Sequence, residues 1–265
     1  MTFFSRCLLA ALIPALPLRA DNAACIINMP CYSNVSVVNS ASYATGWLGP
    51  NTFASIFGWN LTDGVTADGS PGSEGTDGSI GGVRVLLNGT EPAFVSYISP
   101  HQVNLVIPTD LVGQTATLQL VNNGKAGPKV TLAMHDSAPA LFLELDGTTA
   151  VAIHPDGSAV TAQSPARAGE AVKLYATGLG PFARLFGDFT RPSPPDPIAR
   201  LAEFSVLLDG QAVALAARDY VGATAEWVGV VEVNFHLPAG VGRNPEVRIG
   251  LGDRVSPPGT FLPVQ

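Results

Sequence analysis

Two stretches of this chain, VRVLLNGTEPAF at residues 83–94 and FSVLLDGQAVAL at residues 204–215, follow one pattern. Each begins with a short apolar run and then reaches Leu-Asn-Gly or Leu-Asp-Gly. Asn-Gly and Asp-Gly pairs supply the positive φ angles that a tight β-hairpin turn requires. Both stretches therefore predict a strand that turns back into a hairpin, and the chain carries this device twice.

The repetition continues on both sides of the hairpin. The matching segments are QVNLVIPTDL (102–111) with EVNFHLPAGV (232–241), and FASIFGWNL (53–61) with VKLYATGLG (172–180). Between the copies, Gly58 matches Gly178 once a one-residue gap is allowed, and Gly89 matches Gly210, Asn104 matches Asn234, and Pro108 matches Pro238. The first two pairs are 120 and 121 residues apart and the last two 130, so the second copy carries an insertion of about nine residues. Two copies of one strand order predict two domains of similar topology.

Short segments rich in Val, Leu, Phe and Tyr, separated by Gly, Pro and Asp-Gly punctuation, are typical of antiparallel sandwiches. No long run has apolar residues at helical spacing, so the fold class is all-β. We expect β-sandwich domains at 36–138 and 139–265, with Asn104 and Asn234 as structural amides inside apolar strands. The predicted strands are 36–38, 53–59, 83–87, 93–98, 102–107, 116–121, 130–134, 150–154, 171–177, 204–208, 213–217, 228–237 and 246–251.

Residues 1–20, MTFFSRCLLAALIPALPLRA, follow the plan of a secretory signal peptide. Arg6 supplies the basic start, residues 7–18 form the apolar stretch, and Ala20 is the candidate cleavage residue. An uncleaved anchor or a buried N-terminal element is the alternative. No other segment has the length and hydropathy of a membrane span, so we expect none after cleavage. The expected location is secreted, periplasmic or at the outer cell surface.

Cysteine usage agrees with an oxidising compartment. Cys7 would leave with the leader, so Cys25 and Cys31 remain as an even pair in an N-terminal arm at 21–35. Two thiols alone do not make a tetrahedral zinc site. We therefore expect a disulfide, with free thiols as the alternative.

Five motifs in order suggest a family: VVNSASYATGWLGPNTFASIFGWNL, YISPHQVNLVIP, SAPALF, SPARAGEAVKLYATGLGP and VEVNFHLPAG. Together they resemble the uncharacterised C-terminal domain of secreted proteins from Solibacter and other Acidobacteria. The resemblance runs from about Val37 to the end and implies paired immunoglobulin-like sandwiches of the IPT/TIG kind. His101 stands where the related sequences usually have Gly. The resemblance carries over no catalytic residue.

Charge excludes some partners. The formal net charge is −7, and loss of Arg6 and Arg19 leaves 12 basic against 21 acidic residues, about −9. No Lys/Arg run could neutralise phosphates, so we expect no nucleic-acid partner. An acidic surface also disfavours anionic membranes.

Catalytic signatures are missing from the sequence. There is no G-x-S-x-G elbow, and the four histidines (His101, His135, His154 and His236) are dispersed without metal-ligand spacing. A carboxylate pair for glycoside cleavage can come from distant strands, but Glu144, Asp146, Glu226 and Glu232 have no distinguishing context. We assign no catalytic residue and lean against an enzyme.

Binding candidates are aromatic or acidic. Trp47, Trp227 and His101 are the candidate ligand contacts, while Trp59, inside the repeated strand, is expected in the core. The Gly/Ser-rich loop at 63–82 carries four acidic residues without regular calcium-loop spacing. We expect no cofactor, with calcium at this loop as the alternative. The candidate calcium ligands are Asp63, Asp68, Glu74 and Asp77.

These features favour a secreted or cell-surface binding module that recognises polysaccharide or a surface protein. One alternative is a polysaccharide-active hydrolase or lyase with a site in the loops or between the domains. Another is a structural component that assembles through exposed sheet edges. Fold alone does not choose among them.

Overall fold

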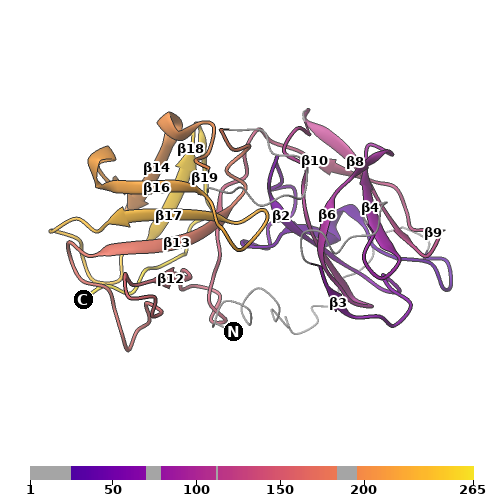
Figure 1. The fold of residues 1–265 in the computed structure, drawn as a ribbon, viewed down its shortest axis with the longest axis horizontal. Coiled ribbons are helices and arrows are strands. Elements are labelled where there is room, and N and C mark those ends of the chain that lie inside the picture. The colour runs from indigo at the N-terminus through magenta and orange to yellow at the C-terminus, as the bar shows by residue number, and fades with distance from the viewer. Residues whose placement is uncertain (1–24, 70–78, 112, 184–195) are drawn as a thin grey trace. The chain divides into compact units, whose positions relative to one another are not determined.

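The computed structural model describes residues 25–69, 79–111, 113–183 and 196–265. These residues form two compact units that divide between Asp136 and Ser137, two residues before the boundary expected from the repeat. Figure 1 shows that each unit has its own set of strands. The expected leader at 1–20 lies outside the described residues.

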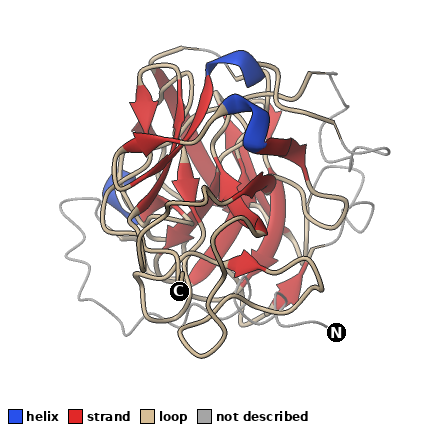
Figure 2. Cartoon of the chain, turned by 90° about the vertical axis from the view of Figure 1, so that its left-hand side faces the viewer, coloured by secondary structure: helices blue, strands red, loops and turns tan. Residues whose placement is uncertain are grey.

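Strands dominate the chain, as Figure 2 shows in red. The helices of the described residues are three short 3-10 turns: η1 (Asn34–Ser36), η2 (Leu201–Glu203) and η3 (Leu215–Ala217). Within the same residues, no helix has the length and hydropathy to cross a membrane. The all-β fold class is therefore confirmed.

Unit 1 contains two antiparallel sheets. In spatial order, sheet 1 comprises β1 (Val37–Asn39), β2 (Phe53–Phe57), β7 (Gln102–Val106), β6 (Phe94–Ile98) and β3 (Ala67–Asp68). Sheet 2 comprises β10 (Val130–Ala133), β8 (Thr115–Asn122), β4 (Val83–Leu87) and β5 (Glu91–Pro92), with β9 (Lys125–Ala126) also paired to β8.

Unit 2 repeats this plan. Sheet 3 comprises β11 (Ala140–Leu141), β13 (Ala171–Thr177), β17 (Val231–His236) and β16 (Arg218–Ala223), with β12 (Ala152–Ile153) paired to β13. Sheet 4 comprises β15 (Gln211–Ala212), β14 (Phe204–Leu208), β18 (Val247–Leu251) and β19 (Arg254–Val255). The order β2-β7-β6 in unit 1 corresponds to β13-β17-β16 in unit 2.

The repeated hairpins form as expected. In β4 and in β14 the first, third and fifth residues are buried and the two between them are partly exposed. Asn88 and Gly89 have φ of 48° and 87°, and Asp209 and Gly210 have 47° and 77°. Positive φ at both central positions is the type I′ geometry that joins strands with right-handed twist. The two predicted turns are confirmed.

The repeated asparagines occupy equivalent places. Asn104 on β7 lies opposite Tyr97 on β6, and Asn234 on β17 lies opposite Tyr220 on β16. In both pairings the register shifts by one residue just before the tyrosine, which is the geometry of a β-bulge. A shared bulge opposite a shared asparagine shows that one strand plan has been used twice.

One pair in the sequence alignment was wrong. The strand ladders place Ser55 and Lys173 opposite the repeated asparagines, so β13 is shifted by two residues from the match of Gly58 with Gly178. Gly178 has φ of 73°, whereas Gly58 is outside the left-handed region. A shift of two residues keeps every side chain on its own face, and for this reason the hydrophobic pattern alone did not reveal it.

The second copy also differs from expectation between its hairpin and Asn234. The predicted strand at 213–217 ends in the helical turn η3, and strand β16, which was not predicted, follows it. Gly222 and the charged residues Arg218 and Asp219 in β16 weaken its strand pattern. The additional residues of the second copy lie in the segments 213–217 and 224–230.

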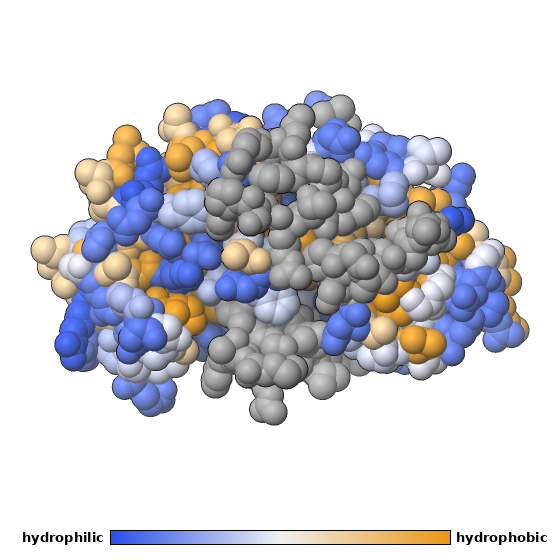
Figure 3. Space-filling view, in the orientation of Figure 1, coloured by the Kyte–Doolittle hydropathy of each residue, from blue (hydrophilic) through white to orange (hydrophobic). Residues whose placement is uncertain are grey.

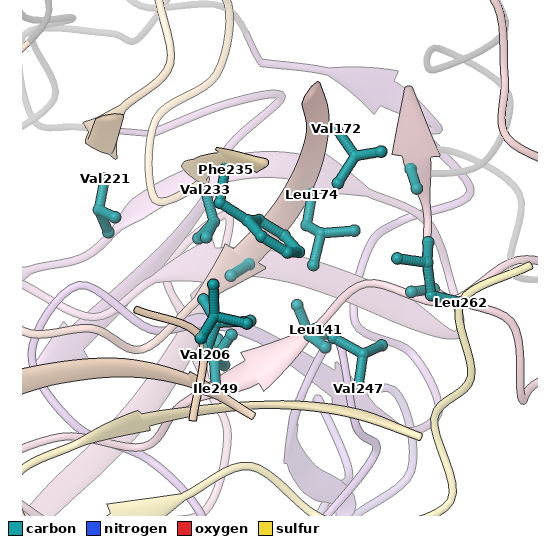
Figure 4. Packing of buried hydrophobic residues seen from close by; sticks show 14 of the residues in the cluster. Leu141, Val172, Leu174, Val206, Val221, Val233, Phe235, Val247, Ile249 and Leu262 are labelled. Carbon is teal, nitrogen blue, oxygen red and sulfur yellow. The ribbon is translucent and has the colours of Figure 1, made fainter. Parts of the chain in front are cut away.

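Each unit encloses its own apolar core. On the face shown in Figure 3, the hydrophobic residues left at the surface are interspersed with hydrophilic ones. The core of unit 2, shown in Figure 4, brings Phe235 and Val233 of β17 together with Val206 of β14 and Ile249 of β18. Unit 1 has an equivalent cluster between sheets 1 and 2. Side chains from two sheets that share one cluster define a β-sandwich.

Replacement of Phe235 by Ala tests the core of unit 2. The ring is fully buried, so its loss should lower the free energy of unfolding by about 3–5 kcal/mol in urea denaturation followed by circular dichroism. Leu215→Ala is the control, because this side chain is 68% exposed and should change stability by less than about 0.5 kcal/mol. Equal effects of the two substitutions would contradict this description of the core.

Candidate ligand-binding surface

Among the aromatic residues that the structure describes, Trp59 is the most exposed. Its side chain is 61% exposed, so the expectation that Trp59 lies in the core was wrong. Strand β2 ends at Phe57, and its core-facing residues are Ala54 and Ile56. Continued alternation places Gly58 inward and Trp59 outward, a signal that the sequence contained.

The backbone of Trp59 is fixed by the N-terminal arm. Its N–H donates to the carbonyl of Cys31 at 2.9 Å, and its carbonyl accepts from the N–H of Cys31 at 2.9 Å. This reciprocal pair is the hydrogen-bonded type found between antiparallel strands. The main chain that carries the indole is therefore held although the indole itself faces solvent.

His101 contacts the exposed indole from the connection between β6 and β7. The two rings meet almost at right angles (82°), with centroids 4.8 Å apart. The Nδ1 atom of His101 lies 3.2 Å from the carbonyl oxygen of Gly58, and the N–H of Gly58 donates to the carbonyl of His101 at 3.1 Å. Ser99 Oγ accepts from the N–H of Gln102 at 3.0 Å and thereby closes the turn. His101, expected as a ligand contact, is exposed and lies beside Trp59.

Gly58 makes the close approach of the arm feasible. A Cβ atom at this position would overlap the carbonyl oxygen of Cys31 and press on the side chain of Leu61. The requirement is steric, because the φ angle of Gly58 is one that other residues adopt. Only glycine lets Cys31 and Trp59 pair here without a backbone shift.

The arm is closed by the expected disulfide. Cys25 and Cys31 are bonded, with their Cα atoms 5.3 Å apart, so this prediction is confirmed. Tyr32 then anchors the arm in unit 1: its hydroxyl donates to the carbonyl of Pro128 at 2.7 Å and accepts from the N–H of Leu120 at 2.6 Å. Burial raises the pKa of Tyr32, against a smaller lowering by the hydrogen bond from Leu120, so the hydroxyl stays protonated at physiological pH.

The other two tryptophans lie in different settings. Trp47 is half-buried, its ring 5.4 Å from that of His135. Trp227 is also half-buried, in the connection between β16 and β17, where Thr224 Oγ1 accepts from its N–H at 2.9 Å. This connection corresponds to the one that carries His101 in unit 1. A ligand role for Trp47 or Trp227 stays a prediction.

The acidic loop is described only in part. Asp63 accepts from Lys125 Nζ at 2.9 Å and from Asn123 Nδ2 at 3.0 Å, hydrogen bonds that lower its pKa. Asp68 lies exposed on β3, while Glu74 and Asp77 lie outside the described residues. The described residues hold no group of three or more His, Cys, Asp or Glu side chains placed to hold a metal. The calcium hypothesis for this loop stays a prediction.

Two of the four candidate carboxylates, Asp146 and Glu232, make local contacts. Asp146 accepts from the N–H groups of Thr148 and Thr149, each at 2.8 Å, and so closes a turn. Glu232 lies 2.8 Å from Lys173 Nζ in an ion pair on sheet 3. These contacts give the two carboxylates structural roles, and the sequence offered no signal for either partner.

One cluster in unit 2 has the composition of a catalytic triad. His154 Nδ1 contacts Glu170, and its Nε2 lies 3.4 Å from Ser164 Oγ. However, Nε2 also lies 3.0 Å from the carbonyl oxygen of Ser164, which can only accept a hydrogen bond. Both ring nitrogens then carry protons, and an imidazolium cannot act as the base that a triad needs. We interpret the cluster as an ion pair that links the end of β12 to the start of β13.

The pKa values of this pair agree with the geometry. Burial acts to lower the pKa of His154, but the hydrogen bonds to Glu170 and the Ser164 carbonyl, with the charges of Glu170 and Asp156, raise it overall. Burial likewise acts to raise the pKa of Glu170, and hydrogen bonds from His154 and the Arg167 N–H lower it overall. Each overall pKa shift favours the charged form of its group, as expected for an ion pair.

Comparison with known proteins gives distant likenesses. No protein-family model and no curated protein matches the chain. Among solved structures it resembles the surface glycan-binding protein PbSGBP-B from Prevotella bryantii, with 10% identity and a TM-score of 0.27 over 80% of this chain and 37% of that one. SGBP-B from the Bacteroides ovatus mixed-linkage glucan utilization locus, in complex with a mixed-linkage heptasaccharide, gives 12% identity and a TM-score of 0.35 over 84% and 43%.

Domains 5–6 of the S-layer protein SbsC give 12% identity and a TM-score of 0.26 over 89% of this chain and 98% of that one. The chain spans less than half the length of the two glycan-binding proteins. Because all three TM-scores are below 0.5, these likenesses carry no argument about function.

Gly58→Ala should loosen the arm beside Trp59. The new methyl group would meet the Cys31 carbonyl and lower the free energy of unfolding by about 1–3 kcal/mol. Gly240→Ala is the matched control, since nothing lies within 4 Å of a Cβ built there and its φ is also outside the left-handed region. Chemical denaturation of both variants measures the difference, and a neutral Gly58→Ala would contradict the close approach.

His154→Gln should destabilise unit 2 in a pH-dependent way. A raised His pKa stabilises the fold below the ordinary imidazole value and stops doing so as pH rises through the folded value, while the lowered Glu170 pKa stabilises above the ordinary carboxyl value. The loss should thus be largest near pH 5.5, about 1 kcal/mol, and smaller at pH 8.5. Urea unfolding at both pH values measures it.

His236→Gln serves as the control for this pH series. Its ring lies 3.3 Å from Asp219, but both side chains are half exposed, so solvent screens the pair. Its substitution should change stability little at either pH. A His154→Gln loss that is constant from pH 5.5 to 8.5 would show that the ring acts by packing alone.

Proposed function

We propose that this chain is a non-catalytic carbohydrate-binding module that works outside the cytoplasm, with Trp59 as its main ligand contact. The observation that carries the proposal is a tryptophan that is 61% exposed, whose main chain is held by two backbone hydrogen bonds and whose ring contacts that of His101. An exposed aromatic ring on a fixed main chain, next to an imidazole and an amide, supports a binding role.

The chemistry of the indole suits a sugar. A pyranose has one apolar face of C–H groups, and an aromatic face can stack on it while nearby polar groups bond the hydroxyls. Asn60, which adopts φ of 56° beside Trp59, and His101 supply such groups at the same place. Because the indole is held before the ligand arrives, little conformational entropy is lost on binding.

The rest of the chain supports a location outside the cytoplasm. The disulfide between Cys25 and Cys31 is of the kind that persists in oxidising compartments. The leader-like residues 1–20 point the same way. We also propose, from the five ordered motifs, that the chain belongs with the Acidobacterial IPT/TIG-like domains it resembles.

The enzymatic alternative has weaker support. In the described residues the arrangement nearest to catalytic machinery is the cluster of His154, Glu170 and Ser164, whose histidine has no free nitrogen to accept a proton. A binding module retains its ligand and leaves it intact, whereas an enzyme releases product. The test of the proposed function therefore measures both retention and turnover.

Trp59→Ala should abolish or greatly weaken carbohydrate retention. Affinity electrophoresis in gels that contain a neutral glucan, a galactomannan or a pectin would measure retention of the protein, and a reducing-end assay would measure turnover. We expect retention on at least one polymer and no turnover. Trp59→Ala should raise the dissociation constant at least tenfold, which corresponds to a loss of about 1.4 kcal/mol of binding free energy. Trp59→Phe should keep part of the affinity, because it preserves an aromatic face.

Phe261→Ala is the control, since Phe261 is an aromatic residue of unit 2 that is 43% exposed. It should leave the dissociation constant within about twofold of the parent chain. No retention on any polymer, or equal retention by Trp59→Ala and the parent chain, would refute the proposed function.

A further inference from the structure

The loop closed by the disulfide exposes two adjacent isoleucines. Ile26 is 68% exposed and Ile27 is 86% exposed, and the turn that carries them is closed by a hydrogen bond from the Met29 N–H to the Ile26 carbonyl. A covalent ring holds these two neighbouring aliphatic side chains in solvent. They therefore do not contribute the favourable free energy that their burial would provide. Such a pair requires a reason other than folding.

The same loop lies beside Trp59. Cys31 is paired with Trp59 through two backbone hydrogen bonds, and the disulfide holds the Cα of Cys25 within 5.3 Å of that of Cys31. Ile26 follows Cys25 by one peptide, about 3.8 Å between Cα atoms. The backbone of the isoleucine pair is therefore tied to the backbone of Trp59 by short, fixed links.

The chain segments that carry the isoleucine pair, Trp59 and His101 have no charged side chain of their own. The residues at 25–31, 57–62 and 99–102 include no Asp, Glu, Lys or Arg, in a chain that carries 35 such residues. Their exposed polar groups are amides and one imidazole, and Asn28 and Asn60 both adopt left-handed φ, 63° and 56°. A surface of this composition offers no counter-charge to a uronic acid, a phosphate or a sulfate.

We propose that the disulfide loop and Trp59 form one continuous platform for a neutral polysaccharide, and that the disulfide is required for full affinity. The proposal rests on the proposed function and names its ligand class. Trp59 stacks on one sugar ring, and Ile26 and Ile27 cover the apolar edge of a further ring on the same chain. A ligand that must reach both should bind more tightly as a longer oligosaccharide than as a single sugar.

The loop can be disturbed without removing Trp59. Tyr32, which is 2% exposed, anchors the chain directly after Cys31 by two hydrogen bonds in unit 1. Reduction of the disulfide should therefore release residues 25–30 while Cys31 and Trp59 stay paired. The oxidation state of Cys25 and Cys31 then changes the ligand-binding surface and leaves the fold unchanged.

The test uses the full chain in three forms: the oxidised parent, the double variant Ile26→Ser/Ile27→Ser, and the double variant Cys25→Ser/Cys31→Ser. Leu145→Ser is the matched control, because Leu145 is 80% exposed but lies in unit 2. The readouts are isothermal titration with a neutral oligosaccharide series from one to six sugars, affinity gels with neutral polymer and pectin, and urea unfolding. A pull-down with neutral phosphatidylcholine vesicles is included.

We expect both double variants to bind the longer neutral oligosaccharides about tenfold more weakly and the shortest ligands about as well as the parent. The free energy of unfolding of both double variants should stay close to that of the parent, as expected if Tyr32 still holds the arm. Leu145→Ser should match the parent in binding and in stability. If Trp59→Ala loses affinity and the loop variants do not, the platform is wrong and the proposed function stands. If neither change affects retention, the proposed function itself fails.

Two other results would also contradict the proposed platform. Stronger retention on pectin than on every neutral polymer would contradict the neutral ligand class. Vesicle binding that disappears in Ile26→Ser/Ile27→Ser, with unchanged sugar binding, would assign the isoleucines to a lipid surface. Treatment of the parent with a reductant must reproduce the effect of Cys25→Ser/Cys31→Ser, because both open the same ring.

Discussion

The central strand of each sandwich, β7 in unit 1 and β17 in unit 2, pairs on both edges, and the rest of each unit is arranged around that pairing. On one side the partner strand runs in regular register, and on the other a bulge precedes the tyrosine opposite the repeated asparagine. The bulge lets one face keep its apolar residues inward while the strand bends. Without this ladder neither core would close.

The two units place different side chains at the same positions of this ladder. Around Asn104, the hydroxyl of Ser55 and the amide of Gln102 both donate to Oδ1 at 2.8 Å, which gives a neutral amide network. Around Asn234, the corresponding positions are Lys173 and Glu232, which form an ion pair. Burial and the charges of Glu232 and Glu226 raise the pKa of the nearby Tyr175 to about 12. One plan has thus been given two chemistries on the outer face of its sheet.

The sequence predicted the type I′ turns, the paired cores, the equivalence of the asparagines and the disulfide. Each depended on a local rule: Asn-Gly chemistry, period-two burial, or two cysteines six residues apart. It also named His101 as a candidate ligand contact, and that role stays a prediction. It failed for Trp59, whose place in an apolar strand suggested burial, because the strand ends two residues earlier and the indole falls on the outward side.

Other parts of the site had no sequence signal. The anchoring of Tyr32 joins residues 88 or more positions apart, and the contact between His154 and Glu170 depends on how β12 meets β13. The two-residue shift of β13 also left no signal in the sequence, since it keeps each side chain on the same face of the strand. Such contacts arise from the pairing of distant segments, and no window of local sequence records that pairing.

By itself the sequence determined that the chain is all-β, that one strand plan occurs twice, and where its hairpins turn, because these follow from local periodicity and from the φ preferences of Asn, Asp and Gly. The alternation along β2 already turns Trp59 outward, and only the tertiary structure decided what stands beside its indole. Cys31, Trp59 and His101 are far apart in the chain and come together through backbone hydrogen bonds across strands, with Gly58 providing the space. A binding surface of that kind is a property of the packing.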